Sequence, residues 1–280
     1  MFFNFLIYSG GAAFILIIQT FFSRRLDPNE KSKSALKTDS LAILVFALGF
    51  GFFFSVSSEL LTDYIDFKIV NIIMLGALIS SYWFFVAPSF YLFRKEKYIR
   101  DFELEKQLRL EGFKYKVLFS DEISLNAYGT GGLPHVRLII IANDLRSQLT
   151  QTELKTIIYH EIGHHEKKHI IKLFGLNIIM YTLYYLLFDF SLNLTTVLYL
   201  ELIIVAVVGA IGGLVYYYLP NKILYYLEYE ADLFSATHNN KEDVISALIK
   251  FDDITEGQLS KGNINHPNLK KRLDNLRRLG

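Results

Sequence analysis

The sequence predicts a mainly α-helical, integral membrane protein that also carries a cytoplasmic α+β segment with a small antiparallel sheet. Its composition is apolar: of 280 residues, 52% are hydrophobic and 15% are aromatic, and the mean hydropathy is +0.28. The apolar residues gather in uncharged stretches, most of them close to the ~20 residues that cross a bilayer. These stretches are residues 1–23, 40–58, 69–93, 173–188 and 202–221. The sequence therefore predicts about five transmembrane helices in a lipid bilayer.

Charges between these stretches predict their orientation. Basic residues follow the first and third stretches, whereas Asp63 and Asp66 follow the second. Because basic loops stay in the cytoplasm, the N-terminus is expected outside. The first stretch is expected to be a span and not a signal peptide, since Arg24 and Arg25 come after it. A net charge of +1 does not indicate a nucleic-acid partner, and the lack of cysteine excludes disulfides and thiolate metal ligands.

Four regions are expected along the chain: three spans in 1–93, a soluble segment in 94–169, a transmembrane hairpin in 170–221 and a second soluble segment in 222–280. Short strands are predicted within the first soluble segment. They cover residues 117–119 and 138–141, joined by a turn-rich link that contains Gly129, Gly131, Gly132 and Pro134. Thr150 and Glu153 then match a capping box, which predicts that a helix begins there. Its packed side is expected to contain Leu154, Ile157, Ile158 and Ile162.

This predicted helix contains the pattern His-Glu-x-x-His twice, in the run HEIGHHEKKH at residues 160–169. Residues four apart share a helix face, so His160 and His164 can bind one zinc ion while Glu161 acts on a water molecule as a general base. In the second copy, Lys167 and Lys168 would repel a dication. His164 and His169 would lie about 140° apart on a straight helix. The first copy is therefore expected to bind metal, and His165 and His169 to form a polar or interfacial face.

A catalytic zinc site of this kind requires a third protein ligand. The segment LEYEAD at residues 227–232 supplies a candidate, because Glu228 and Asp232 lie four apart on a predicted helix. Glu228 is expected to bind zinc, and Asp232 to bind the far nitrogen of a ligating histidine. Glu230 is expected to point elsewhere. The alternative, a solvated acidic patch paired with lysines, is less favoured beside a His-Glu-x-x-His motif.

These motifs together resemble the membrane-integrated gluzincin peptidases that include HtpX and the type 1 CAAX prenyl protease. The likeness extends from about residue 115 to 280 and covers NAYGTG from Asn126, HEIGH with the further His169, ExxAD from Glu228, and HPNLKKR from His266. The resemblance implies a gluzincin-type catalytic domain with one zinc held by His160, His164 and Glu228. It also implies that Asn126 and Ala127 pair with a peptide substrate, and that His266 and Arg272 stabilise the tetrahedral intermediate.

The expected function is zinc-dependent hydrolysis of peptide bonds in membrane or misfolded proteins, at the cytoplasmic face of a bacterial or archaeal cell membrane. Five spans differ from the four of HtpX-like members and the seven of the prenyl protease, so CAAX processing is not the expected role. Two alternatives stay open: a regulatory membrane metalloprotease that cleaves one cytosolic regulator, and a non-catalytic zinc-binding membrane protein. His135 and His238 are expected to be surface histidines.

Overall fold

The computed structural model describes residues 97–132, 136–192, 197–218, 221–262 and 266–278, with α4 (Ala87–Phe93) and a few single positions before it or between these ranges. The first two predicted spans lie outside the described residues, and the third overlaps them mainly at α4. His135 also lies outside them.

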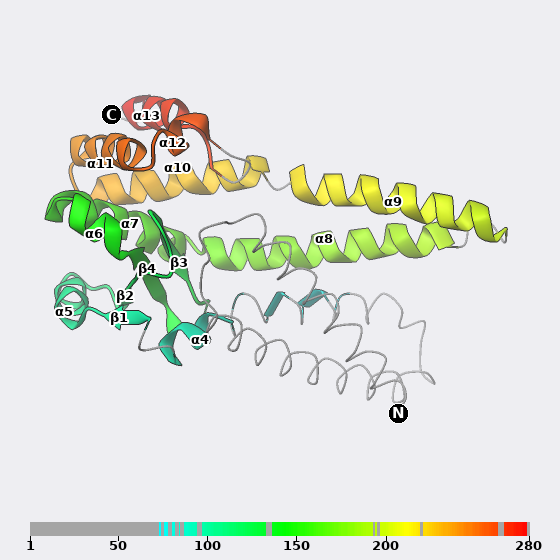
Figure 1. Cartoon of the computed structure of the whole chain (residues 1–280), viewed down its shortest axis with the longest axis horizontal. Coiled ribbons are helices and arrows are strands. Elements are labelled where there is room, and N and C mark those ends of the chain that lie inside the picture. The colour runs from blue at the N-terminus through cyan, green and yellow to red at the C-terminus, as the bar shows by residue number, and fades with distance from the viewer. Residues whose placement is uncertain are drawn as a thin grey trace.

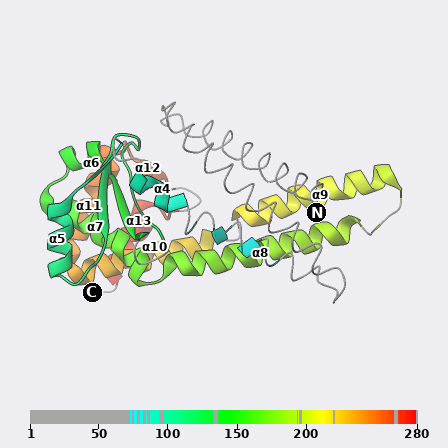
Figure 2. The same ribbon diagram turned by 90° about the horizontal axis from the view of Figure 1, so that it is seen from below.

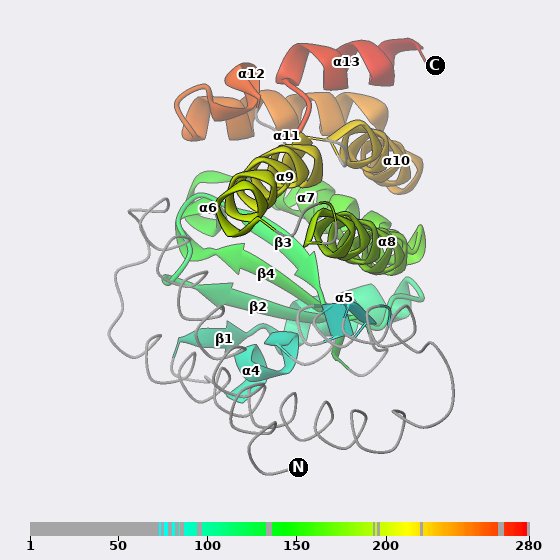
Figure 3. The ribbon, with the colours of Figure 1, turned by 90° about the vertical axis from the view of Figure 1, so that its right-hand side faces the viewer.

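A four-stranded mixed sheet forms the centre of the soluble part. Its strands are β1 (Tyr98–Arg100), β2 (Lys116–Ser120), β3 (Ala127–Thr130) and β4 (Leu138–Ala142), in the spatial order β1-β2-β4-β3 (Figure 3). The prediction of an antiparallel sheet is wrong for its central pair, because β2 and β4 run parallel. The reason is β3: part of the expected turn-rich link forms a strand that reverses the chain and pairs antiparallel with β4.

Helices cover both faces of this sheet. On one face, α5 (Phe102–Leu110), α6 (Asn143–Gln148) and α7 (Gln151–Glu166) share a core with β2 and β4. On the opposite face, Tyr91 and Leu92 of α4 pack against side chains from β1, β2 and β4. All five residues of β4 are buried, as expected for a strand covered on both sides. The buried sheet therefore holds α7 at a fixed position beside β3.

The start of α7 follows the prediction, but the doubled motif does not lie on one straight helix. Thr150 caps the helix through the Glu153 backbone N–H, and the Glu153 side chain accepts from the Thr150 N–H, so the capping box is confirmed. The helix ends at Glu166. Lys168 then has a left-handed backbone, with φ of 59°, and α8 (His169–Leu192) begins directly after it. This turn changes the direction of the chain between His165 and His169.

The helices α8 and α9 (Leu198–Tyr218) lie side by side and project away from the sheet (Figures 1 and 2). They occupy the places of the fourth and fifth predicted spans. Within the described part of the chain, no helix contains a stretch that is both long and apolar enough to cross a membrane.

Helix α10 (Asn221–His238) returns from this pair and packs along α7 (Figure 1). Gly163 makes the approach close: a Cβ there would lie 3.1 Å from the Ala231 Cα, a backbone atom that cannot move without moving α10. The small residue of the first motif copy therefore allows α7 and α10 to pack this closely. The helices α11 (Lys241–Ile254), α12 (Gln258–Lys261) and α13 (Leu269–Arg278) then cover α10.

Candidate metal centre

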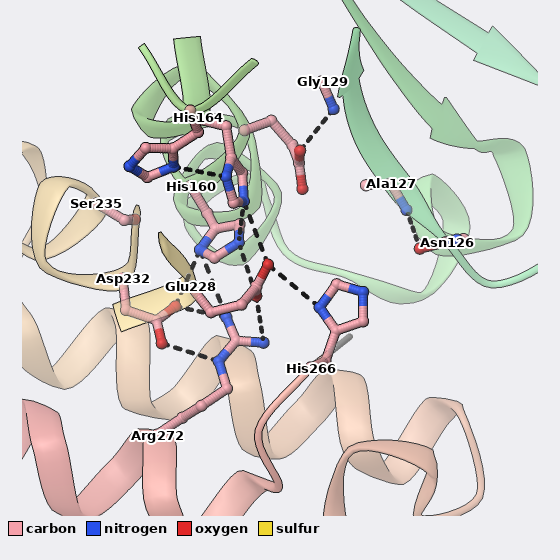
Figure 4. Close-up of polar contacts among 12 residues, drawn as sticks. Asn126, Ala127, Gly129, His160, His164, Glu228, Asp232, Ser235, His266 and Arg272 are labelled. Carbon is pink, nitrogen blue, oxygen red and sulfur yellow. Dashed lines mark hydrogen bonds and ion pairs between the residues drawn. The ribbon is translucent and has the colours of Figure 1, made fainter. Parts of the chain in front are cut away.

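Three predicted ligands meet where α7 and α10 pack together. His160 and His164 project from successive turns of α7, and Glu228 approaches them from α10 (Figure 4). The two Nε2 atoms are 3.2 Å apart. Glu228 Oε2 lies 3.5 Å from His160 Nε2, and Glu228 Oε1 lies 3.4 Å from His164 Nε2. One ligand atom from each residue falls within 4.8 Å of the others, which is a suitable grouping for one metal ion.

The chemistry of these donors fits a zinc ion. Glu228 is buried, and among the described residues its Oε2 atom has no hydrogen-bond partner. Burial opposes its charge, but the neighbouring imidazoles of His160, His164 and His266 hold the pKa of this carboxyl well below its usual range. A buried carboxylate and two imidazole nitrogens that face a common point are the ligand set of a zinc peptidase site. The residues present therefore fit the metal that the sequence predicts.

Asp232 contacts His160 on the side of the ring opposite the other ligands. Its Oδ1 atom lies 2.9 Å from His160 Nδ1, the nitrogen that faces away from the proposed metal position. Burial by itself would lower the pKa of His160, but the carboxylates of Asp232 and Glu228 outweigh burial and raise it to about 10. Zinc requires the neutral imidazole, so metal binding at His160 would release a proton. The predicted placement of Asp232 behind a ligating histidine agrees with this contact.

Arg272 of α13 forms a fork with Asp232. Its Nε donates to Asp232 Oδ2 at 2.8 Å, and its Nη2 donates to Asp232 Oδ1. The Nη1 atom lies 3.6 Å from Glu228 Oε2, which places the guanidinium beside a second buried carboxylate. All three side chains are buried. Arg272 therefore lies close to the proposed metal position, and its guanidinium compensates the charge of two carboxylates there.

Glu161 lies on the side of α7 that faces the sheet. Its Oε2 atom accepts a hydrogen bond of 2.6 Å from the backbone N–H of Gly129 in β3 (Figure 4). A Cβ on Gly129 would lie 3.0 Å from the Glu161 carbonyl oxygen, so glycine lets β3 approach α7 closely without displacing its backbone. Sequence reasoning placed Gly129 in a link and missed this contact. Strand β3 thus fixes the carboxylate that the sequence assigns as general base.

The edge of β3 is the predicted substrate-binding strand. Ala142 donates its N–H to the Asn126 carbonyl, and with the antiparallel register this directs the N–H groups of Ala127 and Gly129 away from β4. No described strand lies beyond this edge. In this structure the outward N–H of Ala127 is bound by the Asn126 side chain, at 2.9 Å. The two outward amides therefore have partners that an extended peptide could replace.

His266 approaches the site from the chain that precedes α13. Its Nδ1 atom lies 3.2 Å from Glu228 Oε1, and the side chain is about half exposed (Figure 4). An exposed imidazole at this place faces solvent and the ligand set at once. The expected role of His266 toward the tetrahedral intermediate stays a prediction.

Comparison with known proteins agrees with this geometry. The sequence model of peptidase family M48 matches residues 96–279, which include the whole candidate site. The chain belongs to family M48. This result confirms the resemblance that the motifs indicated, since M48 is a family of metallopeptidases.

Among solved structures, the crystal structure of S. mikatae Ste24p matches this M48 chain with a TM-score of 0.61 and 20% sequence identity. The match covers 88% of this chain and 66% of the Ste24p chain, just under two thirds. At this identity the likeness shows a shared fold. A search of curated protein sequences found no match.

The two histidines of the second motif copy are buried in this M48 chain, so the prediction of a polar or interfacial face for His165 and His169 is wrong. The left-handed turn at Lys168 breaks the helix, and the assumption of one straight helix fails there. His165 packs between Tyr115 and Gly129, and burial lowers its pKa to about 4. His169 instead contacts His164. His238 is exposed, as expected, and stacks on Tyr159.

Proposed function

We propose that this M48 protein is a zinc-dependent endopeptidase that hydrolyses peptide bonds of membrane or misfolded proteins at the cytoplasmic face of a bacterial or archaeal membrane. The observation that carries the proposal is the convergence of His160, His164 and Glu228 on one point, with the Glu161 carboxylate on the same helix held by β3. This combination matches the needs of metal-assisted amide hydrolysis.

In the proposed mechanism, His160, His164 and Glu228 hold the zinc ion. A zinc ion bound there would lower the pKa of the attacking water and polarise the scissile carbonyl. Glu161 removes the proton from that water and later delivers it to the leaving amine. Asp232 keeps the Nδ1 proton of neutral His160 in place, so that its Nε2 lone pair stays available. His266 and Arg272 are proposed to stabilise negative charge on the carbonyl oxygen.

The substrate is proposed to bind as an added strand along β3. The outward N–H groups of Ala127 and Gly129 can donate to carbonyl oxygens of an extended peptide, once Asn126 and Glu161 release them. Main-chain pairing of this kind depends little on side-chain identity. It therefore supports a peptidase that accepts unfolded segments of many sequences.

Membrane association is proposed from the apolar character of α8 and α9. Many large apolar side chains on these two helices are exposed, which is unusual for a helix pair that faces water. They include Ile179, Leu183, Leu187, Phe190, Ile203, Val207 and Ile211. The apolar composition of the whole sequence supports the same location.

Metal removal tests the proposed activity. Purified full-length protein in detergent is incubated with fluorescein-labelled casein, an unfolded protein substrate, and release of labelled peptides is measured. A zinc chelator should abolish release, and addition of zinc in slight excess over the chelator should restore it, because zinc supplies the chemistry. Magnesium, which prefers oxygen ligands, is the matched control and should restore nothing. Peptide release that persists after complete zinc removal would contradict the proposal.

A further inference from the structure

The buried His169 has a defined relation to the metal ligand His164. His169 is only 1% exposed, although two lysines precede it in the sequence. The left-handed turn at Lys168 brings the first residue of α8 back against the last turns of α7. As a result, His169 Nδ1 lies 2.9 Å from His164 Nδ1, and the ring planes are inclined at 72°.

Only one arrangement of protons satisfies this contact when zinc is bound. His164 directs its Nε2 toward His160 and Glu228, so this atom must keep a free lone pair for the metal. The ring proton of neutral His164 is then on Nδ1 and points at His169. His169 Nδ1 must accept this hydrogen bond, because two N–H groups at 2.9 Å would repel one another. The ring proton of His169 is therefore on Nε2.

Glu230 holds that tautomer of His169. Its Oε2 atom lies 3.1 Å from His169 Nε2 and can accept the proton there. The same oxygen accepts from Lys172 Nζ at 3.0 Å, which keeps the carboxylate in place. The hydrogen bonds thus run in one direction, from His164 to His169 and from His169 to Glu230. As expected, Glu230 is not in the metal-ligand group. It contacts His169 instead, which the sequence did not predict.

We infer that His169 is a positioning residue that fixes the tautomer and ring orientation of the zinc ligand His164, and that Glu230 fixes His169 in turn. This inference rests on the proposed zinc site. The two imidazole ligands are then supported by different chemistry: His160 by the charged carboxylate of Asp232, and His164 by a neutral imidazole. Outer partners of this kind commonly change metal affinity about 10–100-fold.

The test measures zinc affinity of the purified full chain by competition with a fluorescent zinc chelator. Leucine in His169→Leu fills much of the ring volume but accepts no hydrogen bond. Asparagine in His169→Asn places an amide oxygen near the position of Nδ1 and can accept from His164. We expect His169→Leu to bind zinc about 10–100-fold more weakly than wild type, and His169→Asn to recover most of the loss. His238→Asn, at the exposed end of α10, is the control and should not change the affinity.

A second pair of variants does not disturb the buried ring. Glu230→Gln keeps a side-chain oxygen that can accept from His169, whereas Glu230→Ala removes it and permits the wrong tautomer. Zinc affinity should fall in Glu230→Ala and stay near wild type in Glu230→Gln. In the His169→Leu background, Glu230→Ala should have no further effect, because Glu230 acts through His169. Circular dichroism of the zinc-free proteins identifies any variant that fails to fold.

Two results would overturn the inference. The first is equal zinc affinity in wild type, His169→Leu and Glu230→Ala. The second is equally weak binding by His169→Asn and His169→Leu, since a packing role alone would then explain the loss. If the wild-type protein itself bound no zinc, the proposed function would fail and the inference with it. If the wild type binds zinc and the variants bind it equally well, the inference about His169 is contradicted, and the proposed zinc site is not.

Discussion

Replacing Glu161 with glutamine should lower peptide release from labelled casein by about 10²–10⁴-fold, the usual contribution of a general acid–base group. Glutamine cannot take a proton from water, although it has nearly the same shape. Its side-chain oxygen can still accept from the Gly129 N–H, so the local structure should not change. Glu161 is not one of the three grouped ligands, and zinc content should therefore match wild type.

The matched control for this variant is Glu166→Gln, a change to the Glu of the second motif copy. Glu166 accepts from Tyr115 at the surface end of α7 and faces away from the ligand group. This control should keep full activity and full zinc content. Peptidase activity that survives in Glu161→Gln would contradict the mechanism. Loss of zinc from Glu161→Gln would show instead that Glu161 belongs to the ligand set.

Replacing Arg272 with leucine should lower the free energy of unfolding of the zinc-free protein by about 3–5 kcal/mol, the usual effect of removing one partner from a buried ion pair. Asp232 and Glu228 are both nearly fully buried, and the guanidinium lies beside both of them, as does the imidazole of His160. Without the guanidinium, the two buried carboxylates would keep only the protonated His160 to balance their charge. Urea unfolding in detergent, with chelator present, measures this change.

Arg277→Leu is the control, because Arg277 lies on the same helix and is exposed. It should change the free energy of unfolding by less than about 0.5 kcal/mol. The double variant Arg272→Leu/Asp232→Leu should be more stable than Arg272→Leu alone, since only one buried carboxylate then remains beside the His160 imidazolium. If Arg272→Leu were as mild as Arg277→Leu, the account of its role as buried cation would be wrong.

The sequence predicted the parts of the site that depend on local periodicity. His160 and His164 share a helix face because they lie four residues apart, and the capping box located the start of that helix. Glu228 and Asp232 follow the same rule on α10. Each of these predictions needs only the geometry of one helix.

The features that were missed depend on contacts between distant segments or on unusual backbone. The left-handed residue before α8 is a lysine, and glycine or asparagine would have been the ordinary sequence signal for it. Without that turn, His169 could not be placed against His164. The direction of β4 depends on β3, a four-residue strand, AYGT, whose residues are all partly buried and so show no alternation that would mark a strand. The second copy of the motif was the one sequence feature that indicated further histidines, His165 and His169, close to the metal ligands.

The central claim is that His160, His164 and Glu228 bind one zinc ion, and anomalous X-ray diffraction at the zinc absorption edge tests it most directly. Crystals of the full-length protein, grown with one equivalent of zinc, should show a single strong anomalous peak. The peak should lie about 2.0–2.2 Å from both Nε2 atoms and from a carboxylate oxygen of Glu228. A peak between His165 and His169 would contradict the claim. A fully occupied zinc site elsewhere in the protein, with no peak among the three predicted ligands, would contradict it equally.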